Sequence, residues 1–507
     1  MTGRLWLASR VGLALLLMVS FYALAIGLST ILVWLVFAEL KHLSHVNLKL
    51  PLVLLGAAAT ILWSIVPRPD KFVPPGPRVE PSQEPALFSA IRDVAGATGQ
   101  AMPADVYLVN NVNAFVAQRG GLMGVGSHRV MGLGLPLMQA VTVQEFKGIL
   151  AHEFGHYHAG DVALGPWIYN TRGAIGRTIE QLSGNLLQAI FVWYGSVFLR
   201  ITHAVSRRQE YIADEVAARA AGASAMASGL RRVHAAAVAF DHYWRGEVAH
   251  VLDSGYLPPL SQGFARFMQH ATVASNMAAV VEHEEHGGQT DPYDTHPALR
   301  DRLAALSTLE PGADGDARPA TVLLSDVGRW ERQILAATVG DHWASGLKAM
   351  PWEKVVESVY VPLWRKRVQQ HRRLFGPFTI ATVPTSRLDL APLGDAFLGL
   401  DRDEAAAVPA DIRVSHGVQL LTSAIALALV DVGWTASASI GDEIVLTRDG
   451  GDLRPFSELL AIATGTSQSA AERTPVTTDW RSRCAELGIS DVRLVSDSVE
   501  AASVPRV

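Results

Sequence analysis

The sequence near the N-terminus contains a long apolar stretch, because no charged residue occurs from Val11 to Ala38. A helix of about 20 apolar residues crosses a bilayer, so this stretch is long enough to span a membrane with some tilt. The segment Ala23-Leu24-Ala25 resembles the cleavage site of a signal peptide, but the sequence stays apolar as far as Phe37. Signal peptides have shorter apolar cores, which favours a retained transmembrane helix.

A second charge-free stretch, from Leu50 to Val66, follows after a short loop and predicts a transmembrane hairpin. Both ends of a hairpin lie on the same side of the membrane. Basic residues precede and follow the hairpin, whereas the loop holds only two lysines. The flanking residues are Arg4, Arg10, Arg68, Lys71 and Arg78. The positive-inside rule therefore predicts a multi-pass membrane protein with two N-terminal spans and a cytoplasmic catalytic region.

A third apolar run, from Leu186 to Leu199, ends at Arg200. It is shorter than the roughly 20 residues that a span requires, so it predicts a buried core helix or a segment that grazes the membrane. Whether residues 186–199 enter the bilayer stays open at this point.

Residues His152-Glu153-Phe154-Gly155-His156 form the H-E-x-x-H pattern of zinc peptidases. Residues four apart on a helix share a face, so His152 and His156 can bind one cation. Glu153 is then placed to take a proton from a metal-bound water. Thr142 and Glu145 form a capping box, which predicts a helix from Val143 to Ala159 that stops at Gly160. The alternative is a surface helix with two solvated histidines.

A third metal ligand is required, and the long metzincin pattern does not supply one, because Ala159 and Val162 occupy the positions of its Gly and His. A second helix offers Glu210 and Asp214, four residues apart and therefore on one face. Glu210 is predicted to bind the metal, and Asp214 to accept the free N–H of a liganding histidine. An ordinary solvated charged helix is the alternative.

The two motifs together resemble the membrane-bound gluzincin metallopeptidases of the HtpX and CAAX-prenyl endopeptidase type. The likeness extends from about Pro85 to Leu306. It includes the segment Asn113-Ala114-Phe115-Val116, which is similar to the family's strand beside the active-site cleft, and the pair His296-Pro297 with Arg302 six residues after the histidine.

The resemblance implies roles for these further residues. Asn113 to Val116 are expected to form an edge strand that binds an extended protein or peptide substrate through its backbone, with an interior strand as the alternative. His296 is expected to donate a hydrogen bond to the oxyanion during catalysis, with a structural histidine as the alternative. Arg302 is expected to tie helices together through a carboxylate near the site.

Composition excludes two classes of protein. The net charge is −5 and no basic stripe with interleaved aromatic residues occurs, which argues against nucleic acid as a partner. The single cysteine, Cys484, excludes a disulfide scaffold and is typical of a reducing compartment. The oligomeric state is not predicted.

The predicted fold is α+β and mainly helical, with a small sheet before the zinc helix. The transmembrane hairpin covers residues 1–66, with spans at about 11–38 and 50–66. Seven prolines between residues 67 and 85 predict an extended linker. A gluzincin-type zinc peptidase domain is assigned to residues 86–310, a helical connector to 311–376, and a C-terminal α+β module of unknown role to 377–507.

The sequence predicts a membrane-anchored zinc metalloendopeptidase with one Zn²⁺ per chain, held by His152, His156 and Glu210. The metal would lower the pKa of its bound water towards 7, and Glu153 would act as the general base. Quality control of membrane proteins is one expected role. The alternatives are a prenyl-protein protease and a membrane scaffold or binding protein with a structural metal site. The natural substrate and the cleavage specificity are left open.

Overall fold

The computed structural model describes residues 2–42, 49–121, 125–157, 165–287, 296–465 and 479–495. The chain divides into two compact units. Unit 1 contains Met1–Asp241 and Ser275–Ser345, and unit 2 contains His242–Ala274 and Gly346–Val507. The domain boundaries given above stay a prediction, since the two units group the chain in another way. The mainly helical α+β fold is confirmed.

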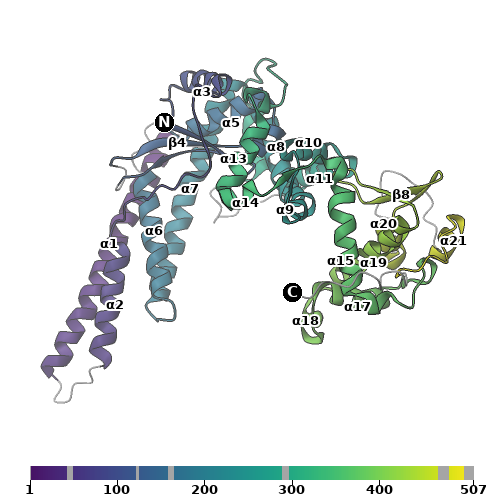
Figure 1. The fold of residues 1–507 in the computed structure, drawn as a ribbon. Helices are drawn as coiled ribbons and strands as arrows, with labels where there is room; N and C mark the ends of the chain where they lie inside the picture. The colour runs from purple at the N-terminus through teal and green to yellow at the C-terminus, as the bar shows by residue number, and fades with distance from the viewer. Residues whose placement is uncertain are drawn as a thin grey trace. The chain divides into compact units, whose positions relative to one another are not determined.

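Four helices of unit 1 lie side by side: α1 (Thr2–His42), α2 (Lys49–Ile65), α6 (Gly165–Gln181) and α7 (Gln188–Ala221) (Figure 1). Apolar side chains from all four pack together, among them Phe21, Ile61, Ile175, Phe191 and Phe198. The outward faces of α1, α2 and the first half of α7 are apolar as well, and Trp34, Trp63 and Trp193 are each about two-thirds exposed. A helix that is apolar on every face is typical of a membrane environment.

By length and composition, three helices among the described residues could cross a membrane: Leu15–Lys41 within α1, all of α7, and α19 (Ala410–Asp431). Helix α2 is apolar but shorter. The sequence prediction ended the third apolar run at Arg200, whereas α7 continues to Ala221. Arg200 does not end the helix because its side chain is exposed, and the more polar second half of α7 packs against α5 (Val143–Gly155).

Unit 1 also contains a four-stranded sheet with the order β1-β2-β4-β3. Its strands are β1 (Arg78–Val79), β2 (Asp105–Val109), β3 (Ala114–Arg119) and β4 (His128–Gly134). Strand β4 pairs with β2 in parallel and with β3 antiparallel. Gly132 faces Phe115, whose ring lies where a Cβ atom at residue 132 would sit. Because β3 comes last in this strand order and pairs only with β4, it forms an edge of the sheet within the described part of the chain.

Helix α5 begins as predicted, since Thr142 Oγ1 accepts a hydrogen bond from the Glu145 amide and the Glu145 carboxylate accepts one from the Thr142 amide. The predicted end at Ala159 is wrong, because the helix ends at Gly155 with His156 as its C-cap. The Tyr157 amide donates to the Phe154 carbonyl, which tightens the last turn. Residues 158–164, including Gly160, lie outside the described residues.

The remaining helices of unit 1 surround this centre. They are α3 (Pro85–Thr98), α4 (Leu135–Ala140), α8 (Ala223–Tyr243), α11 (Ala271–Gly287), α12 (Leu299–Leu306), α13 (Val327–Val339) and α14 (Asp341–Ser345), with α8 and α11 each reaching the border of unit 2. Helices α5 and α7 approach closely at Gly155, where a Cβ atom would lie 2.8 Å from Ala213 Cα. This close approach brings the two predicted metal motifs together.

Unit 2 is built around α19, which is buried for most of its length among α15 (Val361–Gln370), α17 (Arg387–Leu398) and α20 (Pro455–Thr464). Because most of α19 is buried, its apolar composition is that of a core helix. A three-stranded antiparallel sheet follows α19 in the chain, and Cys484 is buried. The other elements are α9 (Ala249–Asp253), α10 (Leu260–Gln269), α16 (Arg372–Phe375), α18 (Arg402–Ala407), α21 (Trp480–Glu486), β5 (Tyr256–Leu257), β6 (Lys348–Ala349), β7 (Thr435–Ser437), β8 (Val445–Arg448) and β9 (Gly451–Leu453).

Candidate metal centre

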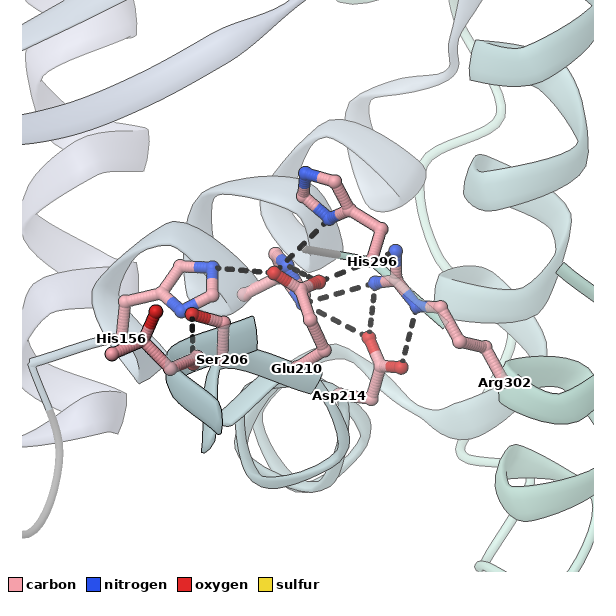
Figure 2. A network of polar contacts seen from close by, with 8 residues as sticks. His156, Ser206, Glu210, Asp214, His296 and Arg302 are labelled. Carbon is pink, nitrogen blue, oxygen red and sulfur yellow. Dashed lines mark hydrogen bonds and ion pairs between the residues drawn. The ribbon is translucent and has the colours of Figure 1, made fainter. Parts of the chain in front are cut away.

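Two imidazoles from α5 and one carboxylate from α7 converge in unit 1. His152 Nε2 lies 3.4 Å from Glu210 Oε2, and His156 Nε2 lies 3.7 Å from Glu210 Oε1. One ligand atom from each of the three residues lies within 4.8 Å of the others. Figure 2 shows the His156 ring and the Glu210 carboxylate turned toward one another. The structure thus brings together the three residues that the sequence predicts as ligands.

The donor set and its spacing fit zinc. Zinc–nitrogen and zinc–oxygen bonds of roughly 2.0–2.2 Å in a tetrahedron separate neighbouring ligand atoms by about 3.3–3.6 Å. His152 Nε2 lies 3.4 Å from Glu210 Oε2 and His156 Nε2 lies 3.7 Å from Glu210 Oε1, near this value, and the three ligand atoms together lie within 4.8 Å of one another. Glu210 is 4% exposed, and its Oε2 atom makes no well-formed hydrogen bond within the described residues, because the donors His152 Nε2 and Arg302 Nη1 each lie 3.4 Å away. A buried carboxylate oxygen without a hydrogen bond is costly, and a bound cation would relieve that cost.

A buried ion pair fixes the orientation of His152. Asp214 Oδ1 lies 2.9 Å from His152 Nδ1, so Nδ1–H can donate to the carboxylate while Nε2 faces Glu210. Arg302, at the start of α12, donates to both oxygens of Asp214, at 2.9 and 2.6 Å. These contacts, visible in Figure 2, are of the kind that set the tautomer of a metal-binding histidine. The structure thus brings Asp214 and Arg302 together beside His152, and the roles assigned to them stay predictions.

The two histidines differ in their protonation without metal. Burial lowers the pKa of His152, but the contacts with the carboxylates of Asp214 and Glu210 outweigh it and raise this pKa to about 9. Burial, together with the neighbouring charge of His152, lowers the pKa of His156 to about 4. At neutral pH, without metal, His152 is therefore a positively charged imidazolium and His156 is a neutral imidazole.

Glu153 lies beside the predicted ligands on α5 and faces the edge strand. Burial raises the pKa of Glu153 to about 7, and the charge of His152 opposes this rise. The backbone amide of Val116 in β3 donates a hydrogen bond to the Glu153 carboxylate. A carboxyl group with a pKa near 7 is suited to accept and release a proton at neutral pH.

His296 lies against the same carboxylate as the predicted ligands. Its Nδ1 atom is 3.1 Å from Glu210 Oε1, and its side chain is 60% exposed (Figure 2). Pro297 follows it, and α12 begins two residues later at Leu299. The proposed oxyanion role of His296 stays a prediction.

A cavity of about 660 Å³ extends from the metal residues. Asn113, Ala114 and Phe115 line one part of it. The sequence analysis missed a set of apolar side chains that also line the cavity: Leu137, Ile149, Met226, Leu230 and Val233. Spacings of four and seven residues along α8 place Met226, Leu230 and Val233 on one face, and this pattern alone could have indicated a buried or cleft-facing helix.

Comparison with known proteins identifies the part of the chain that holds this centre. Residues 81–310 match the family model described as peptidase family M48. The match covers just under half of the chain. The resemblance to HtpX-type membrane metallopeptidases, inferred above from the motifs, is thereby confirmed.

Curated relatives of the M48 region are named as proteases. The chain is 24% identical over 247 residues to a protease HtpX homolog of Paraburkholderia phytofirmans, and 25% identical over 244 residues to one of Ralstonia pickettii. Each match covers 45% of this chain and 75% of the relative. No solved structure matches the chain significantly. The matched family and the names of these relatives support a protease of a zinc-dependent family, a class that acts on proteins or peptides.

Proposed function

We propose that this chain is a membrane-anchored zinc metalloendopeptidase that binds one Zn²⁺ per chain through His152, His156 and Glu210. The observation that carries this proposal is the convergence of these three side chains, from two separate helices, beside Glu153 and an edge strand in one cavity. The M48 match over residues 81–310 supports the same function.

Zinc, when bound, supplies a Lewis acid and an activated water. We propose that Glu153 accepts a proton from the attacking water and later transfers it to the leaving amine, since one carboxylate serves both steps. Asp214 and Arg302 hold His152 with Nε2 directed at Glu210. His296 is proposed to donate a hydrogen bond to the developing oxyanion from its exposed position in the cavity.

The substrate is proposed to bind in extended form along β3. In an antiparallel ladder, alternate residues direct their backbone groups to the partner strand and to the free edge. The Asn113 carbonyl accepts a hydrogen bond from the Gly134 amide, at the end of β4. Ala114, the next residue, therefore presents its N–H and C=O to the open edge, where Ala114 also lines the cavity.

The membrane is the proposed location of α1 and α2, with the M48 region on the cytoplasmic side. Helices α6 and α7 pack on this hairpin through the shared apolar cluster, and α7 also carries Glu210. We therefore propose that the active site lies close to the membrane surface, with membrane-protein quality control as one role. A scaffold with a structural metal would need a closed fourth ligand position, and among the described residues the clustered ligands number three.

Cleavage of an unfolded protein is the direct test of this function. The full-length chain, purified in detergent with zinc, is expected to degrade casein, because backbone binding at an edge strand is not sequence-specific. Addition of a chelator should stop the reaction, and added zinc should restore it. Gel electrophoresis and mass spectrometry of the casein fragments would follow the loss and the recovery of cleavage. Cleavage that continues unchanged after the metal has been removed would refute the zinc mechanism.

Zinc binding at pH 8 is expected to release about one proton per chain. His152, with a pKa of about 9, is protonated at this pH in the metal-free site and must become neutral to bind the metal. His156 and Glu153, with pKa values of about 4 and 7, are already unprotonated. The apparent affinity should therefore increase as the pH rises towards 9 and level off above it.

Calorimetric titrations of the metal-free protein in two buffers of different ionisation enthalpy would count the protons. Glu210→Ala protein gives the background from weak binding elsewhere. Tight zinc binding without proton release at pH 8 would show that His152 is neutral in the metal-free site, contrary to this account.

A further inference from the structure

The backbone N–H and C=O of Val116 both form hydrogen bonds to side chains at the end of α5. One partner lies within the H-E-x-x-H motif and the other immediately follows it. The Val116 amide donates to the Glu153 carboxylate. The Val116 carbonyl accepts a hydrogen bond from the hydroxyl of Tyr157, at 2.9 Å. Strand β3 is thus attached to the end of α5 at one residue, through one bond to the proposed base and one to the residue after His156.

The two bonds act on the same edge of the strand. In a β-strand the N–H and C=O of one residue point to the same side, and in β3 those of Val116 point away from β4, as do those of Ala114. A bond that fixes the carbonyl of Val116 therefore also restricts the direction of its amide. The amide in turn is the backbone donor that holds the carboxylate of Glu153.

Tyr157 is itself held from a second direction. The guanidinium of Arg129, in β4, lies 4.3 Å from the centre of the Tyr157 ring. Arg129 Nη1 donates to the carbonyl of Ala101 at 2.9 Å, and Gln100 Nε2 donates to the Tyr157 carbonyl at 3.4 Å. A cation placed over an aromatic ring fixes the ring as well as attracting it. The phenol is thereby oriented toward the edge strand by contacts that do not involve the metal residues.

We propose that Tyr157 is a positioning residue for catalysis, which holds Val116 so that the Val116 amide orients the carboxylate of Glu153. The inference rests on the proposed function, since it assigns to Glu153 the role of base. It also limits the substrate, because Val116 is closed to backbone pairing. An extended peptide adds to β3 at Ala114, on the N-terminal side of this contact.

The test compares Tyr157→Phe with Tyr243→Phe in the full-length protein. The first variant removes the hydroxyl and keeps the ring under Arg129. The second is a matched control, because Tyr243 also donates its hydroxyl to a backbone carbonyl, that of Leu260 at 2.8 Å, but lies in unit 2. For Tyr157→Phe we expect kcat on a fluorogenic peptide to fall by roughly 5- to 10-fold, the effect of one neutral hydrogen bond, while KM changes less than about twofold.

Two readouts separate positioning from a general loss of structure. Zinc content should stay at the level of the unmodified protein. Hydrogen–deuterium exchange should become faster in the peptide that covers β3, residues 114–119, and stay unchanged in peptides from α3 and α7. Tyr243→Phe should leave kcat and the exchange of β3 unchanged.

Several results would overturn the proposal: unchanged kcat in Tyr157→Phe, unchanged exchange in β3, loss of zinc, or a comparable fall of kcat in Tyr243→Phe. Failure of the proposed function would look different. The unmodified chain would then not cleave peptides at all, whereas the exchange measurement would still report whether Tyr157 holds β3.

Discussion

Glu153→Gln is expected to abolish peptide cleavage while the protein keeps its zinc. Glutamine has nearly the same shape as glutamate, and its side-chain oxygen can still accept the hydrogen bond from the Val116 backbone amide. It cannot take a proton from water. General acid–base catalysis contributes about 10²- to 10⁴-fold to a rate, and Glu153 is proposed to act in two proton transfers. We therefore expect kcat to fall by at least about 100-fold.

The measurement is cleavage of a fluorogenic peptide, together with the metal content of the same sample. Glu215→Gln is the matched control, because Glu215 lies on α7 near the site but its side chain is exposed and pairs with Arg219. This control should retain full activity. If Glu153→Gln with a full complement of zinc cleaved peptides at the normal rate, Glu153 would have no part in the proton transfers.

The candidate metal residues could be picked out from the sequence because their pairing depends on local geometry. His152 and His156 are neighbours on any helix, and so are Glu210 and Asp214. The capping box at Thr142 likewise acts within four residues, and the structure contains it. What the residues alone did not supply was the contact between the two helices. That the two helices meet was inferred from the need for a third metal ligand, and its structural basis is the missing side chain at Gly155.

The parts that the sequence did not reveal depend on long-range packing. Helix α6 contains Arg172, Arg177 and Glu180, so its membership of the apolar bundle is not evident from composition. The end of α5 at Gly155, four residues before the predicted end, is set by bonds in its last turn. The bond from Tyr157 to Val116 joins residues 41 positions apart. No periodic pattern indicates a contact of that kind.

Glu210→Ala is expected to remove zinc from the protein, and activity with it. Alanine leaves two imidazoles without a third ligand. Loss of groups that merely support metal ligands costs roughly 10- to 100-fold in affinity, so loss of a ligand should cost at least about 100-fold. Zinc should also no longer stabilise the variant. A ligand present at 100 times its Kd stabilises the folded state by about 2.7 kcal/mol. This contribution disappears when the Kd rises above the working concentration of zinc.

The test measures zinc content after dialysis and the midpoint of thermal unfolding with and without added zinc. Glu215→Ala, five residues further along α7, should behave like the unmodified protein in both. The comparison isolates the position of the carboxylate, since both variants lose one negative charge from the same helix. Full zinc occupancy in Glu210→Ala would show that the third ligand lies elsewhere. Helix α7 would then contribute no metal ligand through Glu210.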